Sequence, residues 1–135
     1  MIKYQNSIKG ISAKQLKGFF IGWKNSPSAE THLKLLRNSY KVILAINIET
    51  ENVVGFITTI SDGVLSAYIP FLEVLPKFQN KNIGSQLVKR MLKKLEGFYM
   101  IDLICDPELE GFYKEFGMKG SIGMILRNYD KQSGK

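Results

Sequence analysis

Hydrophobic residues recur along the chain at two spacings, and the switch between them predicts where strands give way to helices. The clearest switch lies in residues 71–95, which predict a strand, a polar connection beginning at Pro76, and an amphipathic helix beginning near Ile83 or Gly84. The apolar positions of this helix lie three or four residues apart, as on one buried face: Ile83, Leu87, Val88, Met91, Leu92 and Leu95. The rest of the chain is organised around this strand, turn and helix.

The segment before residue 41 predicts a short strand and two helices. Residues 2–6 predict the strand, and Ser12 with Gln15 forms the capping-box pattern of a short helix carrying Leu16 and two phenylalanines. A second helix is predicted from Ser26, as N-cap with proline at the next position, to Asn38.

Three β-rich stretches follow in direct succession and predict consecutive antiparallel strands. They are residues 41–48, 53–60 and 64–75, joined by a polar turn and by the turn signal Asp62-Gly63. Proline cannot donate a hydrogen bond to a neighbouring strand, so Pro70 predicts an edge or a bulge within the third stretch.

The remaining elements complete an alternating α/β pattern. Residues 99–105 predict a strand that lies parallel to its neighbour after the helical crossover. Asp106-Pro107 predicts the start of a short helix through Phe116, residues 120–127 predict a last strand, and residues 128–135 predict a frayed tail.

Length and composition predict one domain over residues 1–135. The chain is 44% hydrophobic and 23% charged, as in ordinary soluble globular proteins. It has no apolar run of the roughly 20 residues that span a bilayer, and residues 1–10 lack an apolar signal core, so we expect a cytoplasmic protein without a membrane partner. Cys105 is the only cysteine, which excludes an internal disulfide and a thiolate cluster, and His32 is the only histidine. We expect Cys105 to be buried and inert, His32 to be a surface or half-buried packing residue, and no metal to be bound.

The net charge of +7 favours polyanions as partners, nucleic acid among them. Most of the excess lies in residues 77–94, which hold six basic residues and no acidic one: Lys77, Lys81, Lys89, Arg90, Lys93 and Lys94. The last four are typical of a solvated helix face, whereas Lys81 lies inside the connection and within reach of a bound phosphate.

The connection itself suits an anion. A tight turn into a helix N-terminus leaves several backbone N–H groups free, with the positive end of the helix dipole behind them. Neither the GxxxxGK[ST] loop nor the GxGxxG fingerprint is present at this position. What stands there is Gln-Asn-Lys-Asn-Ile-Gly-Ser at residues 79–85, preceded by Leu-Glu-Val at residues 72–74.

This segment resembles the Q/R-x-x-G-x-G/A signature of the GNAT N-acetyltransferase superfamily, which cradles the pyrophosphate of acetyl-coenzyme A. Asn82 replaces the first glycine of the signature, and asparagine is the residue that best tolerates a positive φ after glycine. Ser85 replaces the last small residue. The resemblance implies acetyl-CoA as cosubstrate, bound by Leu72, Val74, Gln79, Lys81, Asn82, Ile83, Gly84, Ser85 and Phe112.

A second segment, Phe-Tyr-Lys-Glu-Phe-Gly-Met at residues 112–118, resembles the FYxxxGF motif of the same superfamily, with Met118 in place of the final Phe. It lies some thirty residues after residues 79–85, called here the phosphate loop, across one helix and one strand, as in the family. The resemblance covers most of residues 41–127. It implies the α/β GNAT acyl-CoA N-acyltransferase fold: a mixed central sheet with antiparallel N-terminal strands and a splayed strand pair, flanked by helices.

The resemblance also implies catalytic roles. Tyr113 is the candidate general acid, because a phenol of pKa about 10 stays protonated beside a thiol of about 8.5. Glu73 is the candidate general base because it is the carboxylate nearest in sequence to the expected reacting carbonyl. Some family members carry their catalytic Glu earlier in this strand, where this chain has Ser66, Ala67 and Tyr68. A solvated strand residue or a charge that orients the substrate remains open for Glu73. The N–H of Val74 is a candidate donor to the thioester carbonyl. Phe20, Trp23 and Tyr68 line either the acceptor pocket or the core.

The function predicted is direct transfer of an acetyl group from acetyl-CoA to a primary amine of a small-molecule or peptide acceptor. The alternative is a non-catalytic domain of the same fold that binds a CoA ester or a polyanion. A small nucleic-acid-binding domain explains the charge but neither motif, so nucleic acid is disfavoured as a partner. The sequence does not identify the amine, and it leaves a homodimer open.

Overall fold

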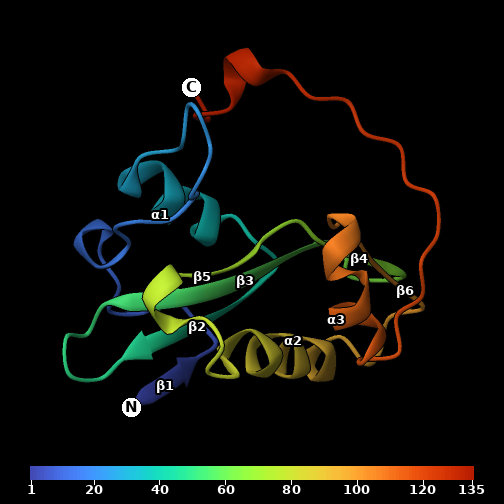
Figure 1. Cartoon of the computed structure of the whole chain (residues 1–135), viewed down its shortest axis with the longest axis horizontal. Helices are drawn as coiled ribbons and strands as arrows, with labels where there is room; N and C mark the ends of the chain where they lie inside the picture. The colour runs from blue at the N-terminus through green and yellow to red at the C-terminus, as the bar shows by residue number, and fades with distance from the viewer.

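A mixed six-stranded sheet forms the centre of the molecule (Figure 1), and the computed structural model describes residues 1–135. The strands pair in the order β1-β2-β3-β4-β6. Strand β5 also pairs with β3, at residues 55–57, whereas β4 pairs with β3 at residues 60–61. All pairs are antiparallel except β4 with β6. The strands are β1 (Ile2–Gln5), β2 (Lys41–Asn47), β3 (Val53–Ser61), β4 (Ser66–Ile69), β5 (Leu72–Val74) and β6 (Met100–Leu103).

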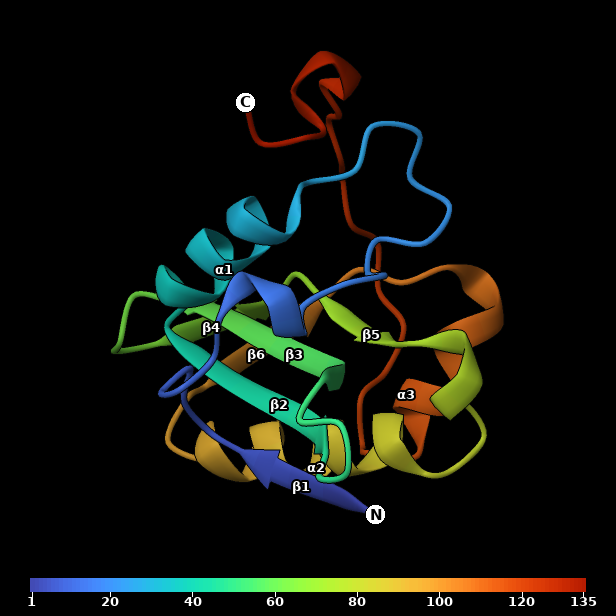
Figure 2. The same cartoon turned by 90° about the vertical axis from the view of Figure 1, so that its left-hand side faces the viewer.

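Helices cover the two faces of the sheet unequally. Helix α2 (Ile83–Lys94) lies under one face, and α1 (Ala29–Arg37) lies over the other (Figures 1 and 2). Helix α3 (Glu110–Lys114) is short and follows β6 through the turn η3 (Pro107–Leu109). Three further 3-10 turns are η1 (Ala13–Gln15), η2 (Pro76–Phe78) and η4 (Tyr129–Lys131).

The core is split into two layers by β2 and β3, whose successive side chains point to opposite faces. Ile43, Ala45 and Ile57 pack against α2 on one side. Leu44, Ile46 and Phe56 pack against α1 and residues 16–20 on the other. The helix pattern predicted for α2 is confirmed, because its buried residues include Ile83, Leu87, Val88, Met91 and the adjoining Leu95. The mixed α/β fold predicted from the sequence is confirmed as well.

The third predicted strand is broken in two, where the sequence predicted one continuous element. Tyr68 in β4 pairs with Ile60 near the end of β3, whereas Glu73 in β5 pairs with Phe56 further back. Pro70 stands at the break, where its missing N–H removes one ladder hydrogen bond. After the break, β5 stays with β3, whereas β6 stays with β4, so β5 and β6 splay apart.

Two predictions for the N-terminal segment need correction. The Ser12–Gln15 pattern forms its capping hydrogen bond, from Ser12 N to Gln15 Oε1 at 2.8 Å, but the helix stops after a single turn. Gly18 at φ +93° and Phe20 at φ +65° are incompatible with a continued right-handed helix. The following helix begins at Ala29, because Ser28 and not Ser26 caps it by accepting from Thr31 N at 3.1 Å.

The last predicted strand does not form within the chain. Residues 120–127, called here the C-terminal arm, are extended and exposed but pair with no strand (Figure 1). After the arm, η4 leads to Gln132, whose Oε1 accepts a hydrogen bond from Asn25 N at 2.9 Å. A Cβ atom built on Gly134 would also lie 2.9 Å from Thr31 Cγ2 in α1, so the predicted frayed tail is held against the N-terminal part of the chain.

His32 is deeply buried, which corrects the expectation of a surface or half-buried residue. Only 1% of the side chain is exposed, and its ring packs against Phe19, Phe20 and Phe56 at centroid distances of 5.3, 4.9 and 4.4 Å. Neither ring nitrogen has a hydrogen-bond partner. Burial disfavours the charged imidazolium and lowers the pKa of His32 from 6.5 to about 4.

This depressed pKa predicts an acid-labile fold. The unfolded chain takes up the His32 proton near pH 6.5 and the folded chain only near pH 4, so stability is complete above 6.5 and falls as the pH drops towards 4. The loss amounts to about 3 kcal/mol. We expect His32→Phe to abolish this part of the pH dependence, measured by urea unfolding across the range. The carboxylates contribute alike to both proteins, and equal slopes in the two would contradict the assignment.

Candidate active site

The connection from β5 to α2 presents an unusual number of free backbone donors. It runs through η2 and then places Asn80 at φ +61° and Asn82 at φ +67°, so asparagine does adopt the positive φ that the sequence suggested. The backbone N–H groups of residues 80–85 donate to no backbone acceptor, and α2 has neither a side-chain cap nor an acidic residue in its first turn. The positive end of the helix is therefore available to an anion.

Gly84 marks the point where both sequence motifs meet. A Cβ atom built on this glycine would lie 3.8 Å from Phe112 Cζ and 3.9 Å from Val74 Cγ2. The fold thus brings β5, the first turn of α2 and α3 together around one backbone position. Gly84 itself has no positive φ, so its role is close approach of the backbone rather than turn geometry.

The splay between β5 and β6 leaves one edge of β5 free. Phe71 O accepts from Thr58 N at 3.1 Å, and Leu75 N donates to Val54 O at 2.8 Å. Because alternate residues of an antiparallel strand face the partner, Leu72 and Val74 direct their N–H and C=O groups away from β3. Gln79 Nε2 donates to Val74 O at 3.0 Å, which commits the Gln79 side chain to the loop and leaves Val74 N free.

Tyr113 lies near Cys105, which follows β6 in the chain. It projects from α3 into the α2-side core with its ring edge-on to Phe112 at 4.9 Å, and only 9% of the side chain is exposed. Burial, with a smaller contribution from nearby Cys105, raises the pKa of Tyr113 to about 12. The phenol therefore keeps its proton throughout the neutral and mildly basic range. Cys105 is half-buried and also stays protonated, because burial and then Glu110 raise the pKa of its thiol.

Glu73 serves as an anchor for the N-terminal loop. Its Oε1 accepts from Phe20 N at 2.8 Å, and its Oε2 accepts from Ile21 N at 3.2 Å. A positive φ is uncommon for a phenylalanine, and these two bonds help to hold Phe20 there. Each carboxylate oxygen keeps a further lone pair, so the group can still accept a proton. Sequence reasoning missed the anchoring role, because the partners lie about fifty residues apart.

Comparison with known proteins identifies the family. The model of the acetyltransferase (GNAT) family matches residues 10–118. The chain belongs to the GNAT acetyltransferase family. A proposed acetyltransferase from Deinococcus radiodurans R1 has a similar structure, with 39% sequence identity, a TM-score of 0.94 and coverage of 98% of this chain and 92% of that one.

Two further relatives agree. A GNAT family acetyltransferase from Streptococcus pneumoniae TIGR4 has 27% identity and a TM-score of 0.70, covering 95% of this chain and 98% of its own. GCN5-related N-acetyltransferase 1, a chloroplastic protein of Arabidopsis thaliana, is 27% identical over an alignment of 131 positions that covers 90% of this chain and 66% of that protein. The predicted GNAT resemblance is confirmed, and the chain is a transferase enzyme that carries out acyl transfer.

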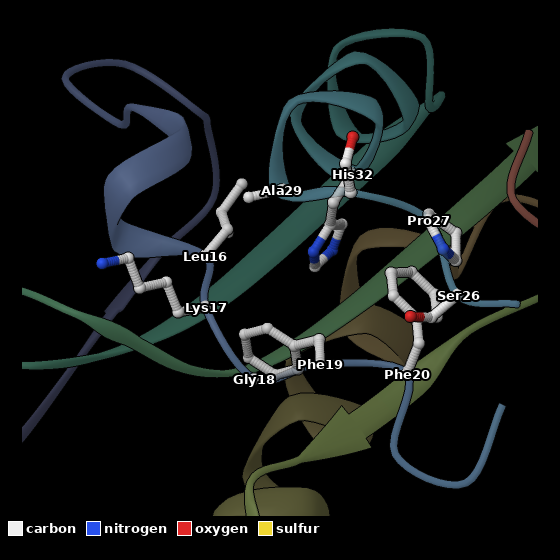
Figure 3. Close-up of a pocket in the computed structure, with 10 residues that line it drawn as sticks. Leu16, Lys17, Gly18, Phe19, Phe20, Ser26, Pro27, Ala29 and His32 are labelled. Atoms are coloured by element: carbon white, nitrogen blue, oxygen red, sulfur yellow. The ribbon is translucent and has the colours of Figure 1, made fainter. Parts of the chain in front are cut away.

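In the GNAT fold described here, a cavity of about 370 Å³ lies beside the loop that Glu73 holds (Figure 3). It is bounded by residues 16–20, by residues 26–29 and by His32. Figure 3 shows the imidazole of His32 pointing from α1 into the space between Phe19 and Phe20. Phe20 borders this cavity and also belongs to the α1-side core, whereas Trp23 and Tyr68 do not line the cavity.

The basic residues of α2 lie away from the phosphate loop. Arg90 stacks 4.2 Å over the ring of Tyr4 and, with Lys93 and Lys94, borders a groove beside β1. At the loop itself the nearby cation is Lys81, which is exposed with Nζ 5.7 Å from the Phe78 ring centroid. The positive charge of the GNAT loop is therefore largely that of backbone N–H groups. No helix is long and apolar enough to cross a membrane, and no group of three potential metal-ligating side chains is present.

Proposed function

We propose that this GNAT enzyme transfers an acetyl group from acetyl-CoA directly to a primary amine of a small-molecule or peptide acceptor. The observation that carries the proposal is the convergence at Gly84 of free backbone donors from residues 80–85 with Val74 and Phe112. Two negative charges of a pyrophosphate match six N–H groups at a helix N-terminus better than they match the basic groove near β1.

The residues present fit acetyl-CoA along its length. The N–H groups of Ile83, Gly84 and Ser85 would hold the pyrophosphate, with Asn82 providing the turn and Lys81 a mobile charge. The free edge of β5 at Leu72 and Val74 would pair with the amides of the pantetheine arm as a strand pairs with a strand. Phe112, in α3, would pack against the pantetheine arm.

Acetyl-CoA supplies a thioester carbonyl, which an uncharged amine attacks. In the proposed reaction, the N–H of Val74 donates to the carbonyl oxygen as negative charge develops there. Glu73 takes the proton that the amine loses, directly or through water, and the Tyr113 hydroxyl donates its proton to the sulfur as the C–S bond breaks. Bulk water then restores the phenol proton and removes the one on Glu73, so the enzyme is unchanged.

In this proposal Glu73 has a second role, because it also positions the loop beside which the acceptor binds. The carboxylate that fixes Phe20 and Ile21 also lies between Leu72 and Val74, the two residues proposed to hold the donor. The acceptor would then enter beside residues 18–22 and meet the thioester at the break in the sheet.

The alternative, a non-catalytic domain that binds a CoA ester, would bind acetyl-CoA without releasing free thiol for any amine. Turnover with an amine would therefore exclude this alternative.

The loop assignment predicts a graded effect of side chains at Gly84. Gly84→Ala adds a methyl group at ordinary contact distance from Phe112 and Val74, whereas the two further methyl groups of Gly84→Val crowd both and cover the free N–H groups. We expect acetyl-CoA to raise the Tm of wild type and Gly84→Ala, and Gly84→Val to lose most of that shift. Gly97→Val, where a Cβ meets nothing within 4 Å, is the matched control. A full shift in folded Gly84→Val would refute the assignment.

Tyr113→Phe tests the general acid. Removing the hydroxyl keeps the ring in its packing site, so the Tm and the affinity for acetyl-CoA should change little. We expect kcat to fall by roughly ten- to a thousand-fold. Because the pKa of Tyr113 is about 12, this loss should be the same at every pH from 6 to 10. Unchanged kcat would show that water protonates the thiolate.

Glu73→Gln separates proton transfer from anchoring. The amide can accept from only one of Phe20 N and Ile21 N, so the loop should loosen and KM for the amine should rise. If Glu73 is also the base, the acidic limb of the kcat/KM profile should disappear in the variant. We expect both effects, measured with one good acceptor. An acidic limb that persists unshifted, with only KM raised, would leave Glu73 an anchoring residue.

A further inference from the structure

The cavity beside residues 16–20 contains a polar side chain that has no partner within the chain. The imidazole of His32 is 1% exposed, borders the cavity, and has no hydrogen-bond partner on either ring nitrogen. Figure 3 shows the ring extending from α1 into this space. Burial lowers the pKa of His32 to about 4, so at neutral pH the ring carries one N–H donor and one acceptor nitrogen. Buried polar groups normally have a partner, and a ligand in the cavity would supply one.

The start of α1 adds free donors to the same cavity. Ala29 is the first residue of the helix and lines the cavity. Ser28 Oγ accepts from Thr31 N at 3.1 Å, but the backbone N–H groups of Ala29 and Glu30 donate to no acceptor in the chain. The positive end of the helix dipole lies behind these two groups. The cavity therefore meets unsatisfied backbone donors as well as the unsatisfied ring of His32.

The charged groups at the cavity also favour an anion. Among the ten residues that line it, Lys17 is the one cation and none is acidic. Glu30, in the first turn of α1, is exposed and does not line the cavity. Leu16, Phe19 and Phe20 contribute apolar side chains to the walls. This combination of donors, positive charge and apolar surface suits a carboxylate attached to an apolar chain.

Phe20 connects the cavity to the candidate base. Its backbone N donates to Glu73 Oε1 at 2.8 Å, whereas its ring borders the cavity with a centroid 4.9 Å from that of His32. Glu73 and the cavity thus lie at opposite ends of one phenylalanine. An acceptor that reaches Glu73 with its amine and the cavity with its other end must carry its carboxylate several bonds away from the amine.

We propose that the acceptor is an amine with a carboxylate at the far end of an apolar chain, and that this carboxylate binds in the cavity to His32 and to the free N–H groups at the start of α1. The inference rests on the proposed function, because it names the acceptor of the same reaction. His32 determines which acceptor binds and takes no part in proton transfer. The carboxylate is that of a small ω-amino acid or of the C-terminus of a short peptide.

Matched pairs of acceptors test the carboxylate. With acetyl-CoA, we expect kcat/KM for 6-aminohexanoate to exceed that for its carboxamide by about ten- to a hundred-fold, because hydrogen bonds to a charged group are stronger than those to a neutral amide. Leucyl-leucine and its C-terminal amide form the second pair, and a preference confined to one pair identifies the source of the carboxylate. Glycine is too short to span Phe20 and should show no preference over glycinamide. Equal kcat/KM within both longer pairs overturns the proposal, and so does an equal preference for glycine.

Substitutions test whether the cavity recognises the carboxylate. His32→Phe keeps an aromatic ring in the packing site but removes both nitrogens, so most of the preference should be lost, and His32→Gln should restore part of it. Lys17→Met should lower the preference about two- to fivefold. Lys14→Met, an exposed lysine of η1 that does not line the cavity, is the matched control and should keep it. Each preference compares two acceptors on one protein, so partial unfolding affects both alike. A full preference in His32→Phe overturns the proposal.

Binding without turnover separates this inference from the proposed function. His32 is the only histidine, so the imidazole signals in an NMR spectrum of the isotope-labelled protein belong to it alone. We expect 6-aminohexanoate, added with or without CoA, to shift these signals saturably, and its carboxamide to leave them in place. Shifted signals without acetylation of any amine would keep the anion site and refute the proposed function. Signals that do not respond to the carboxylate in either state, as when water alone fills the cavity, overturn the inference even if amines are acetylated.

Discussion

The break in the sheet at Pro70 is the constraint on which the candidate site depends. A continuous strand from residue 64 to residue 75 would pair with β3 on one side and with β6 along the other, leaving no free backbone edge. Because the chain breaks there, β4 keeps β6 and β5 does not. Leu72 keeps its N–H and C=O groups free, and Val74 keeps its N–H free while its C=O accepts from Gln79. An enzyme of this family can then bind an amide-containing arm with the same hydrogen bonds that hold its own sheet together.

The phosphate loop follows the same principle of using backbone in place of side chains. Its donors are the free N–H groups of a helix N-terminus, and the positive φ of Asn80 and Asn82 turns the chain so that these groups face outwards. Most basic side chains of α2 lie elsewhere, around Tyr4 and β1. Backbone donors lose no side-chain entropy when a ligand binds, which favours a preorganised site.

Glu73 links strand β5 to the N-terminal loop, which under the proposed function are the donor and acceptor sides of the site. Its backbone pairs with Phe56 in the sheet, whereas its carboxylate holds Phe20 and Ile21 in a loop more than fifty residues earlier. The loop borders a cavity into which His32 points with two unpartnered nitrogens. Loop, cavity and strand are thus coupled by one side chain, so under the proposed function a substitution of Glu73 would act on acceptor position as well as on chemistry.

A chain of this size cannot cover every face of a six-stranded sheet with three helices. Helices α1 and α2 cover the strands from β1 to β3 well, and the α1-side face of β4 and β6 is left in solvent. The C-terminal arm is likewise exposed and pairs with no strand.

The sequence by itself determined the elements whose patterns are local and strong. The period of α2, the hairpin of β2 and β3, the asparagine turn before α2 and the two family motifs were all readable, because each depends on neighbours a few residues apart. Local pattern failed where distant partners decide. The predicted short N-terminal helix is a single turn followed by a loop that Glu73 holds. His32 is buried among aromatic side chains, which the local spacing of residues does not predict. The strand pattern of residues 120–127 is present in the sequence, yet a strand exists only where an edge receives it, and that is a property of the tertiary structure.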